Sequence, residues 1–305
     1  MNLRLSVVSI CRNDAGGLAR TLKSTFKNQQ SFDCWEQIIV DGASTDGSFN
    51  AIAPYKGNPH LGWHVSEPDK GIYNAMNKGA AHARGDYLLF LNSGDELMPG
   101  VLEKVFSSAF DADIAYGDES VVGNTGREGT WSVAEEDFTP AFFLLSGFPH
   151  QSCFISRTWF WKLGGYDESL RIVGDTEFLL RSRLNPDARI VRLPFVVSRY
   201  RLDGLSSNPR FARARMEERK RVMASHFGQF AANRAAQLVL GDMPWISAES
   251  AAAAKADPAL ARCIRRFSAM AARMWKHRVP RLLLSGTMRA CQMAVSTFRG
   301  KHRNP

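Results

Sequence analysis

The sequence is poor in cysteine, and its few thiols are not arranged for metal binding or for a disulfide framework. Five cysteines occur among 305 residues, and no two of them form a CxxC pair. This spacing excludes the zinc-ribbon and disulfide-rich classes of small domain. Scattered thiols are typical of a reducing compartment, so we expect a cytoplasmic protein.

The sequence also lacks a long hydrophobic run. No stretch approaches the ~20 consecutive apolar residues that a membrane-spanning helix requires. Residues 3–10 alternate like a first β-strand, and this apolar run is too short for a signal peptide. We therefore expect a protein that does not cross a membrane, although it can still bind at the inner face of the cell membrane as a peripheral protein.

Acidic residues are absent from the C-terminal part of the chain. Residues 261–305 contain eleven Lys or Arg and no Asp or Glu, and the whole chain has a net charge of +9, which leaves −2 for the first 260 residues. A basic helix with interspersed Met, Trp and Leu favours contact with an anionic membrane surface. The alternative is a solvated helix packed on the main domain. A nucleic-acid partner is not expected.

Strand-like and helix-like patterns alternate along the first part of the chain. Apolar runs predict strands at 5–10, 37–40, 63–66, 87–91 and 114–116, and amphipathic patterns predict helices at 18–28, 49–55, 72–83 and 101–110. This alternation predicts an α/β fold with a doubly wound, mostly parallel sheet flanked by helices. The loops at 13–14, 41–46 and 92–95 should then meet at one edge of the sheet.

The later part of the chain is less regular. Residues 117–150 predict irregular structure with a hairpin, and further helices are expected at 159–163, 175–184 and 209–227, with a strand at 190–200. In the second of these helices, Asp175 stands in the first turn, where a carboxylate commonly caps the helix. His150 is a lone histidine just ahead of a short strand-like run, and such residues are more often structural than functional.

Three polar segments lie where ligands bind in open α/β sheets, beyond the carboxyl ends of strands. Asp95 ends the turn Asn92-Ser93-Gly94-Asp95, and its carboxylate could hold a hard divalent cation beside a diphosphate. Asp41 could hydrogen-bond a base or ribose, and Lys70 before a helix N-terminus could bind phosphate. The alternatives are a solvated turn, an ordinary strand-to-helix turn and a surface lysine.

The segment Pro68–Gly79, PDKGIYNAMNKG, closely resembles the SEPDKGIYDAMNKG motif of family-2 glycosyltransferases, in the branch that builds surface polysaccharides such as colanic acid. The resemblance covers about residues 1–210. It implies a GT-A catalytic domain there, with a nucleotide-sugar half at 1–116 and an acceptor half at 117–210. Residues 211–305 would form a helical, basic extension.

The resemblance also implies roles for particular residues. Asp95 would bind Mn²⁺ or Mg²⁺ in a turn where Asn92 and Gly94 replace the family's carboxylates, and Lys70 would add positive charge. Residues matching nucleotide-binding positions are Ser9, Cys11 and Asp41. On the acceptor side, Asp175 matches the family's general base and Glu177 is the second choice. Weaker matches to substrate-binding positions are His150 and Arg201.

The implied function is an inverting, metal-dependent transfer of a sugar from a nucleoside-diphosphate sugar to a hydroxyl of a growing glycan, expected to be lipid-linked. Two alternatives remain at this point. A sugar-phosphate nucleotidyltransferase would use the loop at residues 11–17 for a triphosphate. An inactive assembly subunit of a polysaccharide pathway would account for Asn92 and Gly94 in the turn.

Overall fold

The computed structural model describes residues 3–28, 31–107, 111–123, 126, 128–135, 143, 148–202 and 209–227. The chain divides into two compact units, and the first, residues 1–135 and 148–212, contains the sheet. In the second unit the described part is mainly helix α7 (Ala212–Phe227). The basic segment 261–305 and its expected membrane contact lie outside the described residues. No helix in the described ranges is long and apolar enough to cross a membrane.

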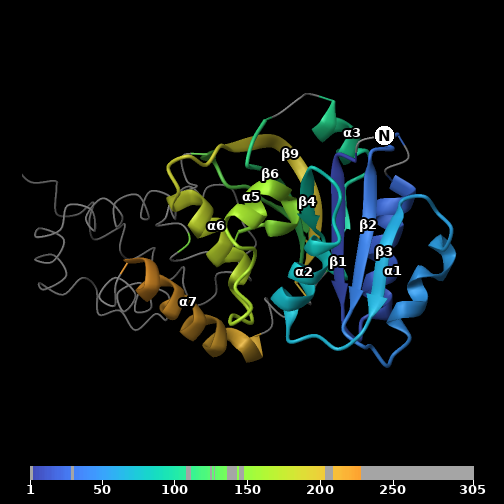
Figure 1. Ribbon diagram of the computed structural model, residues 1–305, viewed down its shortest axis with the longest axis horizontal. Helices are drawn as coiled ribbons and strands as arrows, with labels where there is room; N and C mark the ends of the chain where they lie inside the picture. Colours follow the sequence, from blue (N-terminus) through green and yellow to red (C-terminus); the bar gives the residue numbers. More distant parts are fainter. Residues whose placement is uncertain are drawn as a thin grey trace, which may run out of the picture. The chain divides into compact units, whose positions relative to one another are not determined.

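The N-terminal half of the first unit alternates strand and helix as the sequence predicts. In chain order its elements are β1 (Leu5–Cys11), α1 (Ala15–Asn28), β2 (Trp35–Asp41), the 3₁₀-helix η1 (Ser48–Tyr55), β3 (Leu61–Ser66), α2 (Ile72–Ala81) and β4 (Tyr87–Phe90). The four strands pair in parallel in the order β3-β2-β1-β4 (Figure 1). Their carboxyl ends therefore share one edge, as expected for a doubly wound sheet.

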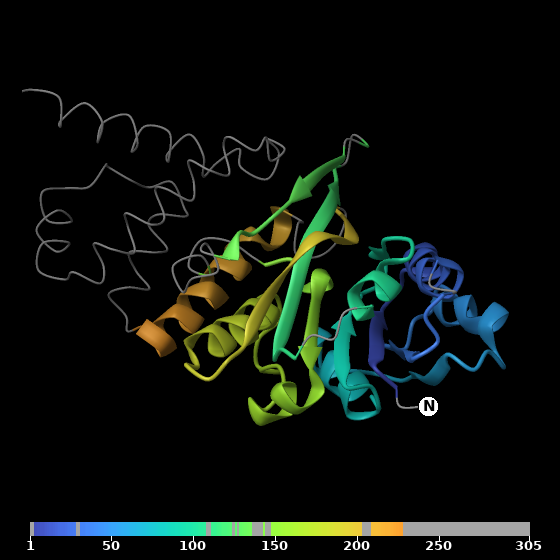
Figure 2. The ribbon, with the colours of Figure 1, turned by 90° about the horizontal axis from the view of Figure 1, so that it is seen from above.

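The second half extends the same sheet with mixed strand directions. Its elements are β5 (Glu96–Leu97), α3 (Val101–Phe106), β6 (Ile114–Val122), β7 (Glu128–Trp131), the 3₁₀-helix η3 (His150–Ser152), β8 (Cys153–Ser156), α5 (Arg157–Lys162), α6 (Gly174–Leu184), β9 (Ile190–Arg201) and the 3₁₀-helix η4 (Pro209–Phe211). Strand β8 is antiparallel to both β4 and β6, whereas β9 is parallel to β6. Figure 2 shows the long strands β6 and β9 side by side.

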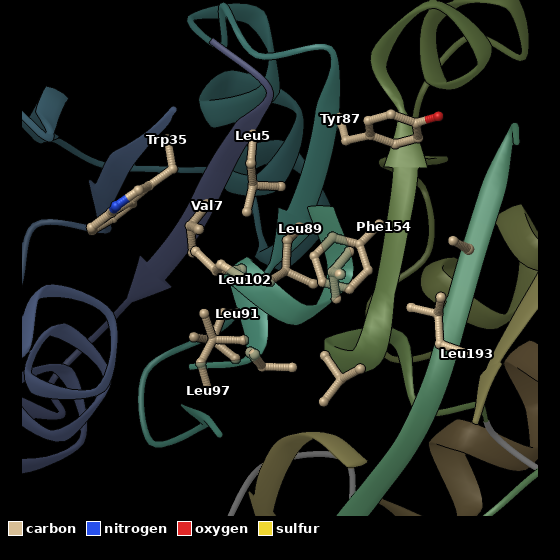
Figure 3. Packing of buried hydrophobic residues seen from close by; sticks show 14 residues of the cluster. Leu5, Val7, Trp35, Tyr87, Leu89, Leu91, Leu97, Leu102, Phe154 and Leu193 are labelled. Atoms are coloured by element: carbon tan, nitrogen blue, oxygen red, sulfur yellow. The ribbon is translucent and has the colours of Figure 1, made fainter. Parts of the chain in front are cut away.

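The core lies on both faces of the sheet because side chains alternate along each strand. On one face, Leu5 and Val7 of β1 pack with Leu89 of β4 and Leu102 of α3, as Figure 3 shows. On the other face, Val8 lies so close to helix α2 that a Cβ on Gly79 would come within 2.5 Å of its Cγ1. Glycine at that position lets α2 pack close to the sheet, and the helix in turn positions the loop that precedes it.

Candidate functional site

Three strand-to-helix loops meet at the carboxyl edge of the parallel strands. The backbone N–H of Asn13 donates to Ser44 Oγ at 2.7 Å, and that of Thr45 donates to Asn13 Oδ1 at 2.9 Å. Ser93 Oγ donates to Asp14 Oδ2 at 2.7 Å. These bonds join the loops after β1, β2 and β4, so the convergence predicted from the sequence is confirmed.

The turn after β4 is fixed by a buried side chain of helix α1. Gly94 has a φ of +97°, which favours glycine, and the N–H of Asp95 donates to the carbonyl of Asn92 at 3.0 Å. Thr21 Oγ1 donates to the Asp95 carbonyl at 2.7 Å and accepts from the Gly94 N–H at 3.1 Å. Thr21 was not predicted from the sequence, because it is one of three buried hydroxyl residues of α1, with Ser24 and Thr25, and nothing in the sequence singles it out.

Asp175 stands in the first turn of α6 and accepts hydrogen bonds from two other segments. Tyr73 of α2 donates its hydroxyl to Asp175 Oδ1 at 2.8 Å. His150 of η3 lies with Nδ1 2.9 Å from Asp175 Oδ2, and both side chains are only 14% exposed. The structure thus brings two predicted site residues, Asp175 and His150, into direct contact.

The ionisation of this cluster follows from burial and from its own charges. Burial disfavours the Asp175 carboxylate, but the His150 charge and the bonds from His150 and Tyr73 outweigh it, so the Asp175 pKa is lowered. Burial likewise disfavours the His150 imidazolium, but Asp175 outweighs it and raises the His150 pKa. Burial, and then the Asp175 charge, raise the Tyr73 pKa well above 10.0, so Tyr73 remains a donor.

Two asparagines of the segment that carries the family resemblance hold the residues before α6 against α2. Asn77 Nδ2 donates to the Tyr166 carbonyl at 2.9 Å, and the Tyr166 N–H donates back to Asn77 Oδ1 at 2.9 Å. Asn74 Nδ2 donates to Glu168 Oε2 at 2.8 Å. These bonds fix the segment that leads into α6 and therefore help to position Asp175.

Two residues predicted to contact the nucleotide have buried side chains that form hydrogen bonds with other groups of the protein. Asp41 is fully buried, and its carboxylate accepts from the Ser44 N–H at 3.0 Å and from the hydroxyls of Ser44 and Ser66. Ser9 is also fully buried, and its Oγ donates to the Leu91 carbonyl at 2.6 Å. Their side chains organise the loop and the sheet, and the contact with a nucleotide expected at these two positions stays a prediction.

Cys11 and Glu177 are also turned inward. Cys11 is 6% exposed, and burial raises its pKa, so a neutral thiol is favoured over a thiolate. Glu177 forms a partly buried ion pair with Arg181 at 2.7 Å, and Arg181 also donates to the carbonyl of Gly165 at 2.7 Å. Glu177 therefore has a structural role in α6, and its expected place on the acceptor side stays a prediction.

Lys70 and Arg201 lie in positions that leave their predicted roles open. Lys70 is exposed ahead of α2, and its N–H donates to Asn74 Oδ1 at 3.1 Å. Arg201 ends β9, where it pairs in register with Val122 of β6.

The residues present suit a cation held mainly by a substrate. Within the described ranges, no group of three or more His, Cys, Asp or Glu could hold a metal ion by itself. Asp95 is 5% exposed and follows β4 at the carboxyl edge of the parallel strands. Nearby Glu119 of β6 has its pKa raised well above 4.5 by burial and then by the Asp95 charge. A single carboxylate fits Mg²⁺ or Mn²⁺ when diphosphate oxygens and water complete the coordination.

The chain matches the family described as Glycosyl transferase family 2 over residues 6–164, which is more than half of its length. This protein belongs to glycosyltransferase family 2. An uncharacterized glycosyltransferase of Mycobacterium tuberculosis is 34% identical to it over 187 residues, which cover 59% of this chain and 69% of that protein. The family-2 chain described here is thus a glycosyltransferase, a transferase of EC class 2.4.

Solved structures of glycosyltransferases share its fold. S. aureus TarS 1–349 in complex with UDP-GlcNAc is 17% identical, with a TM-score of 0.57, over 98% of this chain and 92% of that one. The mannosyltransferase PcManGT from Pyrobaculum calidifontis, in complex with GDP-Man and Mn²⁺, is 20% identical, with a TM-score of 0.54, over 100% of this chain and 89% of that one. The GT-A fold expected from the sequence is confirmed.

Proposed function

We propose that this glycosyltransferase moves a sugar from a nucleoside-diphosphate sugar to a hydroxyl of an acceptor glycan, with inversion at the anomeric carbon. The observation that carries the proposal is the Asp175–His150–Tyr73 cluster, which places a carboxylate and an imidazole in contact. His150 also approaches Asn92 of the turn that ends in Asp95. A base and a candidate cation ligand close together are what one displacement requires.

The donor side is assigned to the turn after β4 and to Lys70. Asp95 would hold a divalent cation, Mn²⁺ or Mg²⁺, together with the diphosphate, and Lys70 would add positive charge. The cation supplies neutralisation of the leaving diphosphate. The bound UDP-GlcNAc of TarS and the GDP-Man and Mn²⁺ of PcManGT support a nucleotide-sugar donor and a cation of this kind.

The reaction needs no enzyme nucleophile. The acceptor oxygen bonds to the anomeric carbon as the bond from that carbon to the diphosphate breaks, and the electron pair leaves with the diphosphate. The acceptor proton passes to a base in the Asp175–His150 pair. A single displacement from the face opposite the leaving group inverts the configuration. Tyr73 keeps Asp175 in place and remains protonated throughout.

The acceptor proposed from the family resemblance is a growing, lipid-linked surface glycan of the colanic-acid type. Such an acceptor would bring the enzyme to the inner face of the cell membrane. The eleven basic residues of 261–305 would then bind anionic lipid. Vesicles with and without anionic lipid would test this part separately from catalysis.

The donor site is tested by thermal shift with UDP, GDP, dTDP and CDP, each with and without Mn²⁺ or Mg²⁺. A ligand present at ~100 times its Kd adds about 2.7 kcal/mol to the free energy of unfolding. We expect metal-dependent stabilisation by one diphosphate, and loss of that metal dependence in Asp95→Asn. The matched control is Asp86→Asn, an exposed residue at the opposite end of β4. No shift with any pair would instead favour the inactive assembly subunit.

A further inference from the structure

The turn before helix α2 places the Asp69 carboxylate over the end of strand β2. Gly42 directly follows β2, and a Cβ added there would come within 2.4 Å of Asp69 Oδ2 and within 3.5 Å of Arg12 Cδ. Arg12 directly follows β1, and Asp69 follows the end of β3. The ends of neighbouring strands thus bring a carboxylate and an arginine together beside a glycine (Figure 1).

The two carboxylate oxygens of Asp69 differ in their partners. Oδ1 accepts from the Gly71 N–H at 2.9 Å, which closes the turn ahead of α2. Oδ2 has no hydrogen-bond partner among the residues that the structure describes. Asp69 is partly exposed, whereas Asp41 on the neighbouring loop is fully buried. Oδ2 can therefore accept a hydrogen bond from a ligand at this edge of the sheet.

The part of the donor that meets Asp69 follows from the proposed function, on which this inference rests. The diphosphate is assigned to the turn after β4, and the strands lie in the order β3-β2-β1-β4. Because neighbouring strands are ~4.8 Å apart, the end of β2 lies about 10 Å from the end of β4. The α-phosphate and the ribose bridge a distance of this order, so the base of the donor reaches the end of β2.

We propose that Asp69 Oδ2 selects the base of the donor by accepting its ring N–H, and that Arg12 donates to the carbonyl oxygen beside it. Uracil and thymine carry this N–H at N3 between two carbonyls, and guanine carries it at N1 beside O6. A carboxylate only accepts hydrogen bonds and a guanidinium only donates them, so the two side chains complement this edge of the base. Asp69 and Arg12 are thus specificity-determining residues of the donor site.

Cytosine and adenine present the opposite pattern to Asp69. Their ring nitrogens, N3 in cytosine and N1 in adenine, carry lone pairs that would face the lone pairs of Oδ2. A site that hydrogen-bonds a group of its substrate rejects an analogue without that group, because its own polar atom is left unpaired. The donor is therefore a nucleoside-diphosphate sugar with uracil, thymine or guanine as its base.

Asparagine at position 69 separates base recognition from the fold of the turn. In Asp69→Asn, Oδ1 can keep the bond from the Gly71 N–H, and Nδ2 then takes the place of Oδ2. A donor there opposes a ring N–H but suits the N3 lone pair of cytosine. Asp167→Asn is the matched control, because Asp167 Oδ1 accepts from the Ser169 N–H at 2.8 Å in an exposed turn before α6.

The test measures Kd by calorimetry on the full-length protein with Mg²⁺ or Mn²⁺, for UDP, dTDP, GDP, CDP and ADP. We expect one of the first three to bind about tenfold or more tightly than CDP and ADP. Asp69→Asn should weaken binding of that diphosphate by about tenfold or more, without weakening CDP. Asp167→Asn should change neither Kd. Asp95→Asn should weaken every diphosphate alike, because Asp95 is assigned to the part they share.

A change in the ligand tests the same contact without a variant. N3-methyl-UDP and N1-methyl-GDP each carry a methyl group in place of the ring hydrogen. The wild type should bind the methylated form about tenfold or more weakly than its parent, and the difference should shrink in Asp69→Asn.

Three results overturn the selection of the base by Asp69. They are CDP binding as tightly as UDP, dTDP and GDP, equal binding of methylated and parent diphosphates by the wild type, and an equal loss for all diphosphates in Asp69→Asn. Each of them leaves the proposed function standing, because a diphosphate is still bound. A wild type that binds no diphosphate overturns the selection of the base and counts against the proposed function as well.

Discussion

At the scale of single residues, the hydroxyl of Tyr73 donates a hydrogen bond to Asp175. Its pKa is raised well above 10.0, so it does not ionise near neutral pH, and its ring lies against Gly174. A Cβ at position 174 would come within 2.7 Å of that ring. Glycine at the start of α6 therefore makes room for the tyrosine that holds the carboxylate.

Tyr73→Phe should separate this hydrogen bond from packing. A bond to a charged group contributes about 1.5–3 kcal/mol, so its loss should lower kcat by roughly tenfold or more while KM changes little. Steady-state kinetics on the donor found in the thermal-shift panel would measure both. The control is Tyr87→Phe, whose hydroxyl donates to the Ala112 carbonyl away from the site. An unchanged kcat in Tyr73→Phe would show that the hydrogen bond from Tyr73 does not position Asp175 for the reaction.

At the scale of elements, the bonds from α2 to the segment before α6 fix the position of the start of α6. Asn77 exchanges two hydrogen bonds with the backbone of Tyr166 and donates to Glu168 Oε1 at 3.0 Å, whereas Asn74 makes one bond to Glu168 and accepts from the Lys70 N–H of its own loop. Asn77 thus makes three bonds to the segment before α6, and Asn74 makes one. When a bond to a backbone group is lost, rotation of a neighbouring side chain does not restore it. The contact made by Asn77 therefore holds the two segments together more strongly than the contact made by Asn74.

Asn77→Ala should destabilise the protein more than Asn74→Ala does. At ~1 kcal/mol for each bond, the three bonds of Asn77 predict a loss of about 3 kcal/mol in the free energy of unfolding, and the two bonds of Asn74 a loss of about 2 kcal/mol, with little change in the slope on urea. Urea denaturation followed by tryptophan fluorescence would measure it. If both variants lost the same amount, the link between α2 and Tyr166 would not have the importance assigned to it.

The elements also show how far the sequence determines the fold and the site. The alternating half from β1 to β4 was predictable because buried strands are continuous apolar runs between amphipathic helices. Strand β5 has two residues and no pattern to detect. The mixed directions of β8 and β9 depend on pairings between distant segments. The same holds within the site, where Tyr73 and Asp175 are in contact although 102 residues separate them.

Residue roles were harder to predict than positions. The loops at 41–46 and 92–95 lie where the sequence predicts them. The carboxylate of Asp41, however, accepts hydrogen bonds from its own loop and from Ser66, and that of Glu177 pairs with Arg181. A carboxylate in a motif can face a ligand or a neighbouring donor, and only the folded geometry distinguishes the two. The contact between His150 and Asp175 could not be read from their spacing for the same reason.

At the scale of the whole molecule, the ion pair between Asp175 and His150 should make the free energy of unfolding depend on pH. The folded pKa of His150 is above 6.5, so its contribution is fully present below that pH and is lost as the pH rises through the folded pKa. The folded pKa of Asp175 is below 3.8, so its contribution is present above that pH and is lost as the pH falls through the folded value.

The stability advantage of the wild type over His150→Gln should therefore be smaller at about pH 9 than at about pH 6. Urea denaturation at the two pH values would measure it, and the exposed His64→Gln should show no such trend. An advantage that stays constant or grows with pH would contradict a raised His150 pKa.

We propose that this family-2 enzyme transfers sugar at the site formed by the turn after β4 and the Asp175–His150 pair. The most direct measurement compares wild type and Asp175→Asn for release of diphosphate from the donor and for calorimetric binding of that diphosphate. We expect a fall in turnover of at least 100-fold with the Kd of the diphosphate nearly unchanged, since Asp175 acts on proton transfer and not on the donor. Near-wild-type turnover in Asp175→Asn would contradict it.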